Sequence, residues 1–375
     1  MTSNVYFINL RASYKESLFK KLALLLDKAG LGTVVQPKDL VAVKLHFGET
    51  GNTGFVRPHF LREIVRGIKA LKGVPFLTDA NTLYAGSRGH SPDHIVTALK
   101  NGFSYATVEA PIIIADGLRG RSQIGVAVER HHFETVYIGS EIVNADVLIS
   151  IAHFKGHELC GFGGTLKNVG MGCASRHGKM AQHAGVAPKV KTKRCIGCGE
   201  CIPRCSQGAI RLFRKKARID PETCIGCGEC ILVCEQEAIQ VQWNKSVPEF
   251  MEKMVEYTEG VLKNKRRKAL FVNFLTDLTP GCDCLPYSDA PFVADIGILA
   301  SSDPVAVDQA AADLVNQAAG LTGSRLDPPP GPGKDKFRTL YPKVDWTHQL
   351  THAEALGLGS CSYRLTKIDS PTPKK

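Results

Sequence analysis

The sequence lacks the features of a membrane-spanning or exported chain. Its 375 residues contain no run of eighteen apolar residues, which a transmembrane helix would need. Residues 1–10 read as a short strand and lack the basic flank, apolar core and small-residue cleavage site of a signal peptide. We therefore expect a cytoplasmic protein without membrane contact, in a compartment that keeps thiols reduced.

Acidic and aromatic residues are scarce relative to basic ones. Lys and Arg number 47 against 36 Asp and Glu, a formal net charge of +11, and aromatic residues make up 7%. Basic runs lie at 189–194, 211–218 and 263–268. They suit a solvated face that offsets nearby negative charge, or docking of an acidic redox partner of the ferredoxin or flavodoxin type. Nucleic-acid binding ranks last, because these runs lack interleaved aromatic residues.

Cysteine, in contrast, is plentiful. There are 13, and eight fall in two quartets spaced C-x2-C-x2-C-x3-C: Cys195, Cys198, Cys201 and Cys205, then Cys224, Cys227, Cys230 and Cys234. A loop that offers a cysteine at every third residue can wrap three corners of an iron–sulfur cubane. A disulfide framework would need an oxidising compartment. Zinc sites more commonly show C-x2-C pairs separated by a longer loop.

Residues 193–240 resemble the bacterial ferredoxin module with two [4Fe–4S] clusters. In that module the fourth thiolate of each cluster comes from the other quartet. The resemblance therefore implies one cluster on Cys195, Cys198, Cys201 and Cys234, and a second on Cys224, Cys227, Cys230 and Cys205. The proline that usually follows each fourth cysteine is replaced here by Ser206 and Glu235.

Apolar runs and helical patterns alternate along the rest of the chain. Strands are expected at 4–10, 40–47, 75–79, 111–116, 147–153, 269–275 and 295–299, and helices at 14–29, 58–71, 92–101, 247–263, 304–318 and near 346–356. The alternation predicts an α/β fold with a mostly parallel sheet and flanking helices. The simplest arrangement is one α/β domain formed by residues 1–188 and 244–375. The ferredoxin-like α+β module interrupts it at 189–243, and a polar tail closes the chain.

Polar, glycine-rich segments follow several of these strands, and ligands in open α/β sheets bind at the carboxyl ends of strands. The candidates for holding an anionic small-molecule substrate are Lys44, His46, Arg57 and Asn168, and the catalytic candidates are Lys167, His153 and His157. Lys167 suits gripping an anion or covalent chemistry. His153 and His157 lie four residues apart and could bind a metal from one helix face, although Gly156 lies between them.

Five further cysteines lie outside the quartets: Cys160, Cys173, Cys282, Cys284 and Cys361. The simplest interpretation is partly buried thiols. Cys282-Asp-Cys284 follows a strand end near the other polar loops. With Cys173 it could hold a third metal or cluster that has one open position, or its thiols could be redox-active.

Several stretches resemble the domain of unknown function 362 family, in members that carry a ferredoxin insertion. The matching stretches are Lys44-Leu-His-Phe-Gly-Glu49, 76–84, 113–117, His153-Phe-Lys-Gly-His157, Gly161-Phe-Gly-Gly-Thr-Leu-Lys-Asn168, 171–175, Thr279-Pro-Gly-Cys-Asp-Cys284 and 302–308. The resemblance implies a cytoplasmic iron–sulfur protein of prokaryotes and names no reaction. More distantly, Gly163-Gly164-x-x-Lys167 is similar to a Gly-Gly-x-Lys segment of nickel-dependent lactate racemases, whose lysine holds a pincer cofactor. The spacing here is one residue longer, so nickel chemistry is not implied.

The combined prediction is an iron–sulfur electron-transfer protein. It would be an oxidoreductase that relays electrons through two [4Fe–4S] clusters to a site at the strand ends of the α/β domain. The alternative is a non-enzymatic, ferredoxin-like electron carrier or a redox-gated binding protein.

Overall fold

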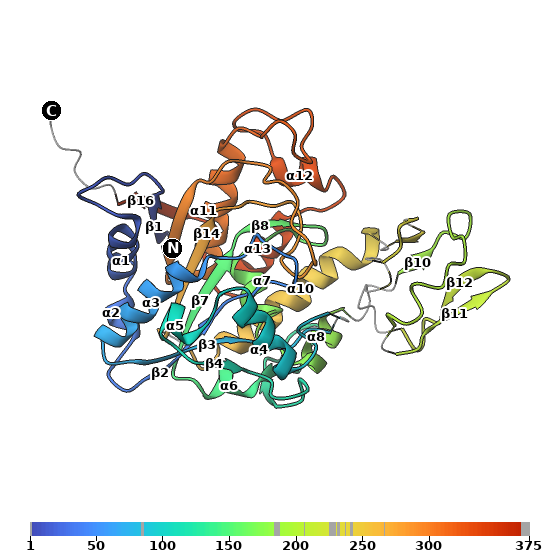
Figure 1. The fold of residues 1–375 in the computed structure, drawn as a ribbon, viewed down its shortest axis with the longest axis horizontal. Coiled ribbons are helices and arrows are strands. Elements are labelled where there is room, and N and C mark those ends of the chain that lie inside the picture. The colour runs from blue at the N-terminus through green and yellow to red at the C-terminus, as the bar shows by residue number, and fades with distance from the viewer. Residues whose placement is uncertain are drawn as a thin grey trace.

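A computed structural model describes residues 2–83, 86–183, 188–205, 207–224, 230, 233–236, 238–240, 243–265 and 267–368, without the side chains of 243–246. Figure 1 shows the order of the elements. The main sheet is built from β1 (Ser3–Asn9), β2 (Leu40–Lys44), β3 (Val74–Asp79), β4 (Ile112–Ile114), β7 (Val147–His153), β14 (Ala269–Leu275), β15 (Gly297–Ser301) and β16 (Tyr363–Lys367). The helices are α1 (Leu18–Lys28), α2 (Leu31–Val34), α3 (Pro58–Ala70), α4 (Ser91–Lys100), α5 (Tyr105–Val108), α6 (Ser140–Asn144), α7 (Thr165–Gly170), α8 (Arg176–His183), α10 (Trp243–Leu262), α11 (Pro304–Gln317), α12 (Lys336–Leu340) and α13 (Thr347–Ala355).

The described residues form one eight-stranded sheet in the order β16-β1-β15-β14-β7-β2-β3-β4. Every strand except β15 points the same way, because β15 pairs antiparallel with β1 and β14 while the other neighbours pair in parallel. The prediction of an α/β fold with a mostly parallel sheet is confirmed. Strands from both sides of the cysteine-rich stretch share this sheet, since β14 pairs with β7.

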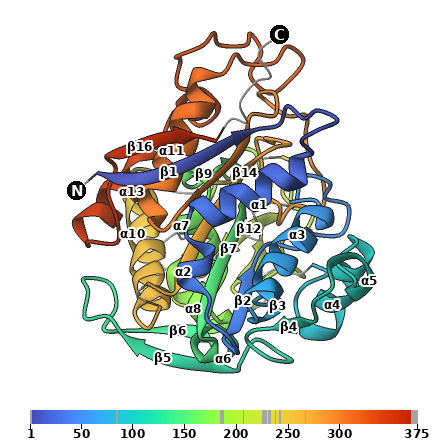
Figure 2. The ribbon, with the colours of Figure 1, turned by 90° about the vertical axis from the view of Figure 1, so that its left-hand side faces the viewer.

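Helices cover both faces of the sheet (Figure 2). The first three helices pack on one face, and α7, α10, α11 and α13 pack on the other. Neighbouring strand residues enter opposite cores: Leu148 and Phe271 face one layer, and Ile149 and Val272 face the other. Strands buried on both faces are apolar along their whole length, which explains the continuous runs in the sequence.

The differences from the predicted elements lie at the margins. The first helix begins at Leu18 instead of residue 14, because Ser17 caps it by accepting the N–H of Lys20 at 3.3 Å. The predicted polar tail contains β16, which pairs in parallel with β1. An edge strand with exposed polar residues such as Arg364 gives no apolar run, and so it was not predicted.

The cysteine-rich stretch forms two small antiparallel pairs. These are β10 (Lys189–Val190) with β13 (Ile239–Gln240), and β11 (Ile210–Phe213) with β12 (Lys216–Ile219). Figure 1 shows them at one end of the molecule, beyond α8 and α10. Among the helices that the structure describes, none is long and apolar enough to cross a membrane. Two further pairs join β5 (Gln123–Ala127) to β6 (Thr135–Gly139) and β8 (Lys155–His157) to β9 (Gly161–Gly163).

Candidate functional site

The carboxyl ends of neighbouring parallel strands meet at one cavity of about 70 Å³. Lys44 and His46 come from the end of β2, Asp79 ends β3 and His153 ends β7. The basic side chains that line the cavity are Lys44, His46, Arg88, His153, Lys155, Lys167, Lys179 and His183, and the thiols of Cys282 and Cys284 lie beside them. A small cavity with this lining suits a small anion.

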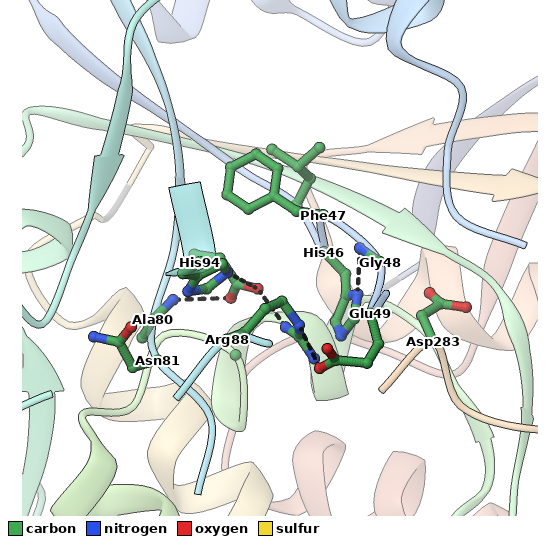
Figure 3. A network of polar contacts seen from close by, with 12 residues as sticks. His46, Phe47, Gly48, Glu49, Ala80, Asn81, Arg88, His94 and Asp283 are labelled. Carbon is green, nitrogen blue, oxygen red and sulfur yellow. Dashed lines mark hydrogen bonds and ion pairs between the residues drawn. The ribbon is translucent and has the colours of Figure 1, made fainter. Parts of the chain in front are cut away.

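Buried ion pairs form one side of this cavity (Figure 3). Arg88 is 1% exposed, and its guanidinium lies 3.2 Å from Glu49 Oε2 and 3.4 Å from Asp79 Oδ2. Burial would raise the pKa of Asp79, but the nearby charges of Lys44, His94 and Arg88 hold that pKa well below its usual range. The Nη2 atom of Arg88 is buried and has no hydrogen-bond partner among the described residues. This donor is available to a ligand.

Lys44 links three strand ends and has no donor left for a ligand. Its ammonium donates to Asn168 Oδ1 at 2.9 Å and to the carbonyl of Leu45 at 3.1 Å, and it lies 3.1 Å from Asp79 Oδ1. Asn168 in turn donates to Ser150 Oγ at 2.9 Å. A lysine has three N–H donors, and all three are used. Lys44 and Asn168, which we predicted to bind an anion, instead support the wall of the cavity.

Of the other two residues predicted to bind an anion, His46 lines the cavity and Arg57 does not. Burial lowers the pKa of His46 well below its usual value, and its Nδ1 accepts the N–H of Gly48 at 3.0 Å. His46 is therefore a neutral imidazole. The side chain of Arg57 is 60% exposed and pairs with Asp277 at 3.1 Å. It precedes α3 at the surface, which places its charge in solvent instead of in the cavity.

The two histidines predicted as catalytic or metal-binding lie on different strands. His153 Nδ1 is 2.8 Å from Asp283 Oδ1, and its Nε2 is 2.8 Å from the carbonyl of Thr276. Both ring nitrogens thus have acceptors, which leaves no lone pair for a metal. His157, at the end of β8, accepts the N–H of Leu159 at Nδ1, at 3.1 Å. Because His153 ends β7 and His157 ends β8, the two side chains do not lie on one face of a helix.

The Cys282-Asp283-Cys284 loop is fixed by its central residue. Asp283 is fully buried between His153, at 2.8 Å, and the ammonium of Lys155, at 3.3 Å. Burial would raise the pKa of Asp283, but the charges of His153 and Lys155 hold it well below its usual range. The loop is therefore clamped by an ionised carboxylate, with a thiol of the cavity wall on either side.

Cys282 lies beside a lysine that is distant in the sequence. Lys167 Nζ is 3.5 Å from Cys282 Sγ. A hydrogen bond from the thiol of Cys284, the charge of Lys167 and a hydrogen bond from His157 lower the pKa of Cys282 well below its usual value, against the effect of burial. The same shared hydrogen bond, together with burial, raises the pKa of Cys284 well above its usual value. The pair is thus a thiolate and a thiol that share a proton.

The start of α7, the helix that carries Lys167, is held by a carboxylate from another helix. Asp308, from α11, accepts the N–H groups of Thr165 at 2.7 Å and Leu166 at 2.9 Å. A Cβ on Gly164 would lie 2.3 Å from Asp308 Oδ1, so only glycine allows this approach. The glycine-rich run before Lys167 therefore cradles a carboxylate of the protein itself.

Cys173, the third thiol of the predicted third metal site, is fully buried and is not among the residues that line the cavity with Cys282 and Cys284. Burial raises the pKa of Cys173 to about 11. Within the described residues no three His, Cys, Asp or Glu side chains converge as ligands of one metal ion.

The cysteine quartets surround their own small core. Cys195, Cys201 and Cys230 are buried with Ile210, Ala217 and Ile239, while Cys198 is exposed. Burial raises the pKa of Cys201, a backbone hydrogen bond lowers it, and the neighbouring thiols of Cys198, Cys195 and Cys234 raise it further. Three sulfur atoms accept backbone N–H groups: Cys205 from Ala209 at 3.2 Å, Cys195 from Ala217 at 3.3 Å, and Cys234 from Ala238 at 3.3 Å. Cys227 lies outside the described residues.

Four charged residues of the site were not among the named binding and catalytic candidates: Asp79, Arg88, Lys155 and Lys179. Asp79 ends β3 and Lys155 follows β7, where the polar segments after the strands were expected to meet. Arg88 and Lys179 lie further along the same polar segments, in a loop and in α8. Burial lowers the pKa of Lys179 to about 8, and Asp116 and Asp79 oppose this effect.

Comparison with known proteins places the chain in a family. Among solved structures, the lactate racemase apoprotein of Thermoanaerobacterium thermosaccharolyticum is similar, with 11% identity and a TM-score of 0.36. The match covers 72% of this chain and 51% of that one, so this chain spans about half its length. A comparison with curated proteins gave no match. Residues 41–313, most of the chain, match the model of the domain of unknown function DUF362, and the protein belongs to that family.

Proposed function

We propose that this protein is an iron–sulfur oxidoreductase that relays electrons through two [4Fe–4S] clusters to the cavity at the strand ends. Cys195, Cys198, Cys201 and Cys234 would hold one cluster, and Cys224, Cys227, Cys230 and Cys205 the other. Bound clusters would supply one-electron transfer. The remaining residues of the chain would bind the substrate and control its protons.

The packing around Cys201 carries this proposal. Cys195, Cys201 and Cys230 are buried in one cluster, and Cys205 and Cys234 pack against it. Thiols of both quartets thus lie in one small core, as the crossed ligand sets of a two-cluster ferredoxin need. Each cysteine of such a cluster binds a different iron, so the four thiols need not converge on one point.

The hydrogen bonds at the sulfur atoms support the same interpretation. Backbone N–H groups point at Cys195, Cys205 and Cys234, which represent both proposed clusters. Such bonds stabilise a negatively charged thiolate and raise the reduction potential of a cluster. The donor set therefore fits thiolate ligands.

The chain connects the quartets directly to the cavity. Helix α8 ends at His183, which lines the cavity, and β10 begins only six residues later, at Lys189. On the return, β13 is followed by α10, which packs against α7, the helix that carries Lys167. A Cβ on Gly170 of α7 would lie 2.1 Å from the carbonyl of Met254 in α10, so the two helices are in close contact.

The cavity indicates the class of substrate. Arg88 Nη2 is a buried donor without a partner among the described residues, and Lys155, Lys167 and Lys179 add positive charge around it. A buried guanidinium donor is best satisfied by an oxygen anion. A small carboxylate or another compact oxyanion is therefore the proposed substrate class.

Iron and sulfide analysis of protein purified without oxygen tests the proposal. We expect about eight irons and eight sulfides per chain, and a paramagnetic signal after reduction with dithionite. Cys201→Ser should lower the iron content, whereas the control Cys361→Ser, far from the quartets in the sequence, should not. Absence of acid-labile sulfide, or iron content that is equal in both variants, would overturn the cluster assignment. If the protein can be reduced reversibly but no small carboxylate or phosphate reoxidises it, the electron carrier would be favoured over the oxidoreductase.

A further inference from the structure

The Cys282-Asp283-Cys284 loop places two thiols side by side at the cavity wall, and the relay function does not by itself account for them. Both line the cavity, and a single residue separates them in the sequence. We propose that Cys282 and Cys284 form a dithiol–disulfide couple that exchanges two electrons with the two clusters. The transfer of electrons from the clusters rests on the proposed function, but the formation of a disulfide between Cys282 and Cys284 does not.

The backbone of the loop between the two cysteines is held in place. Asp283 is buried between His153 and Lys155, and its carbonyl accepts the N–H of Glu49 at 3.1 Å. The backbone between the cysteines is therefore fixed at both its side chain and its carbonyl. One residue separates the two cysteines and both line the same cavity, so rotation of the two side chains can bring the sulfur atoms together to form the bond.

The groups around the pair favour the reduced form with a single negative charge. Lys167 Nζ lies 3.5 Å from Cys282 Sγ, and His157 donates a hydrogen bond to it. The charge of Lys167 and this hydrogen bond stabilise a thiolate on Cys282, which is the nucleophile in thiol–disulfide exchange. Cys284 is the less acidic thiol of the pair.

The electron count matches the proposed cofactors. Reduction of the Cys282–Cys284 disulfide takes two electrons and one proton, breaks the S–S bond, and yields the Cys282 thiolate and the Cys284 thiol. Bound [4Fe–4S] clusters would supply one electron each, so the two proposed clusters would match the two electrons of one disulfide. In the opposite direction, formation of the S–S bond from the Cys282 thiolate and the Cys284 thiol would release two electrons and one proton.

Cys160 is the one rival partner near the pair within the described residues. It is fully buried and lies close enough to His157 to affect it electrostatically. Its carbonyl accepts from Gln349 at 3.0 Å, which fixes the backbone at this position. A disulfide between Cys282 and Cys160 would replace the proposed one, and mass spectrometry distinguishes the two.

The first test does not depend on the clusters. The full chain, kept without oxygen, is equilibrated in mixtures of oxidised and reduced dithiothreitol, blocked with N-ethylmaleimide and mapped by mass spectrometry. We expect Cys282 and Cys284 to lose their label together, as one two-electron step, with a mass that indicates a bond between them. Labelling of both at every potential, or a bond from Cys282 to Cys160, would overturn the couple.

The second test measures the exchange of electrons. Protein reduced with dithionite and freed of excess reductant is mixed with an equal amount of the disulfide form, and the visible absorption of oxidised clusters is followed. We expect two clusters to be reoxidised per disulfide in the native chain. In Cys284→Ser and Cys282→Ser we expect none, with iron content unchanged, while Cys361→Ser should match the native chain. Equal reoxidation in all variants would overturn the exchange. Absence of clusters in the native chain would refute the proposed function and leave the first test to decide the couple.

Discussion

The charge on Lys167 should determine the pKa of the Cys282 thiol, and Lys167→Gln removes that charge with little change in volume. The ammonium lies 3.5 Å from the sulfur. Opposite unit charges about 4 Å apart attract by about 4 kcal/mol at an effective dielectric constant of about 20. Since one pKa unit corresponds to about 1.4 kcal/mol, the shift has a ceiling of about three units. Cys284, His157 and Lys155 remain beside the sulfur, so we expect the pKa to rise by about one to three units.

Alkylation by neutral iodoacetamide measures this shift, because only the thiolate reacts. The modification of Cys282 is quantified by tandem mass spectrometry between pH 6 and pH 9. In the native chain the rate should reach its plateau well below the ordinary thiol pKa, since the pKa of Cys282 is lowered. In Lys167→Gln the plateau should be reached about one to three pH units higher, and below it the rate should rise about tenfold per pH unit.

Lys179→Gln is the matched control, because Lys179 lines the same cavity but is not among the groups that act on Cys282. Its ammonium instead donates to the carbonyl of Ala174 at 2.6 Å. This variant should keep the native profile. Circular dichroism would show that both variants are folded. A native profile that rises through the ordinary thiol pKa, or a profile in Lys167→Gln that coincides with the native one, would refute the ion pair between Lys167 and Cys282.

Three shorter predictions concern the same region. Asp308→Asn should lower the free energy of unfolding in urea by about 1–3 kcal/mol, because its amide N–H₂ would face a backbone N–H that now donates to a carboxylate. Gly170→Ala should lower it by about 1–3 kcal/mol through overpacking against Met254, while Gly331→Ala, with open space around its Cβ, should change it by less than about 0.5 kcal/mol. The rate of alkylation by iodoacetate, divided by the rate with iodoacetamide, should be about tenfold larger for Cys282 than for a cysteine in a free peptide. An attraction of about 1.4 kcal/mol between the iodoacetate anion and the cationic cavity gives this factor. Equal ratios for Cys282 and the peptide would contradict a positively charged cavity.

The parts of the fold that the sequence predicted are those with a local signal. Strands such as 147–153 and 269–275 are buried on both faces, so they read as unbroken apolar runs, and their observed bounds agree. Once these strands are placed in a parallel sheet, the segments that follow them must meet at one edge. That reasoning correctly brought His46 and Lys167 to the same cavity.

The parts that were not predicted depend on contacts between distant residues. Lys167 and Cys282 are separated by 115 positions, and neither neighbourhood in the sequence indicates the other. Arg57 shows the opposite error, because a basic residue in a polar loop has the same local pattern whether it faces a cavity or solvent. Its 60% exposure follows from its position just before α3, which only the packed structure reveals.

The cationic cavity links anion binding to the redox state of the proposed couple. Lys167 stabilises the thiolate of Cys282, and the same positive charges would attract a substrate anion. The disulfide carries no charge, so its formation removes a competitor for Lys167 and should tighten the binding of the anion. Because linkage is reciprocal, the bound anion must favour the disulfide over the dithiol by the same factor. Electrons that arrive from the clusters would restore the thiolate and weaken the hold on the anion. On this proposal the cavity would bind its anion most tightly when the couple is oxidised, and reduction of the couple would promote release.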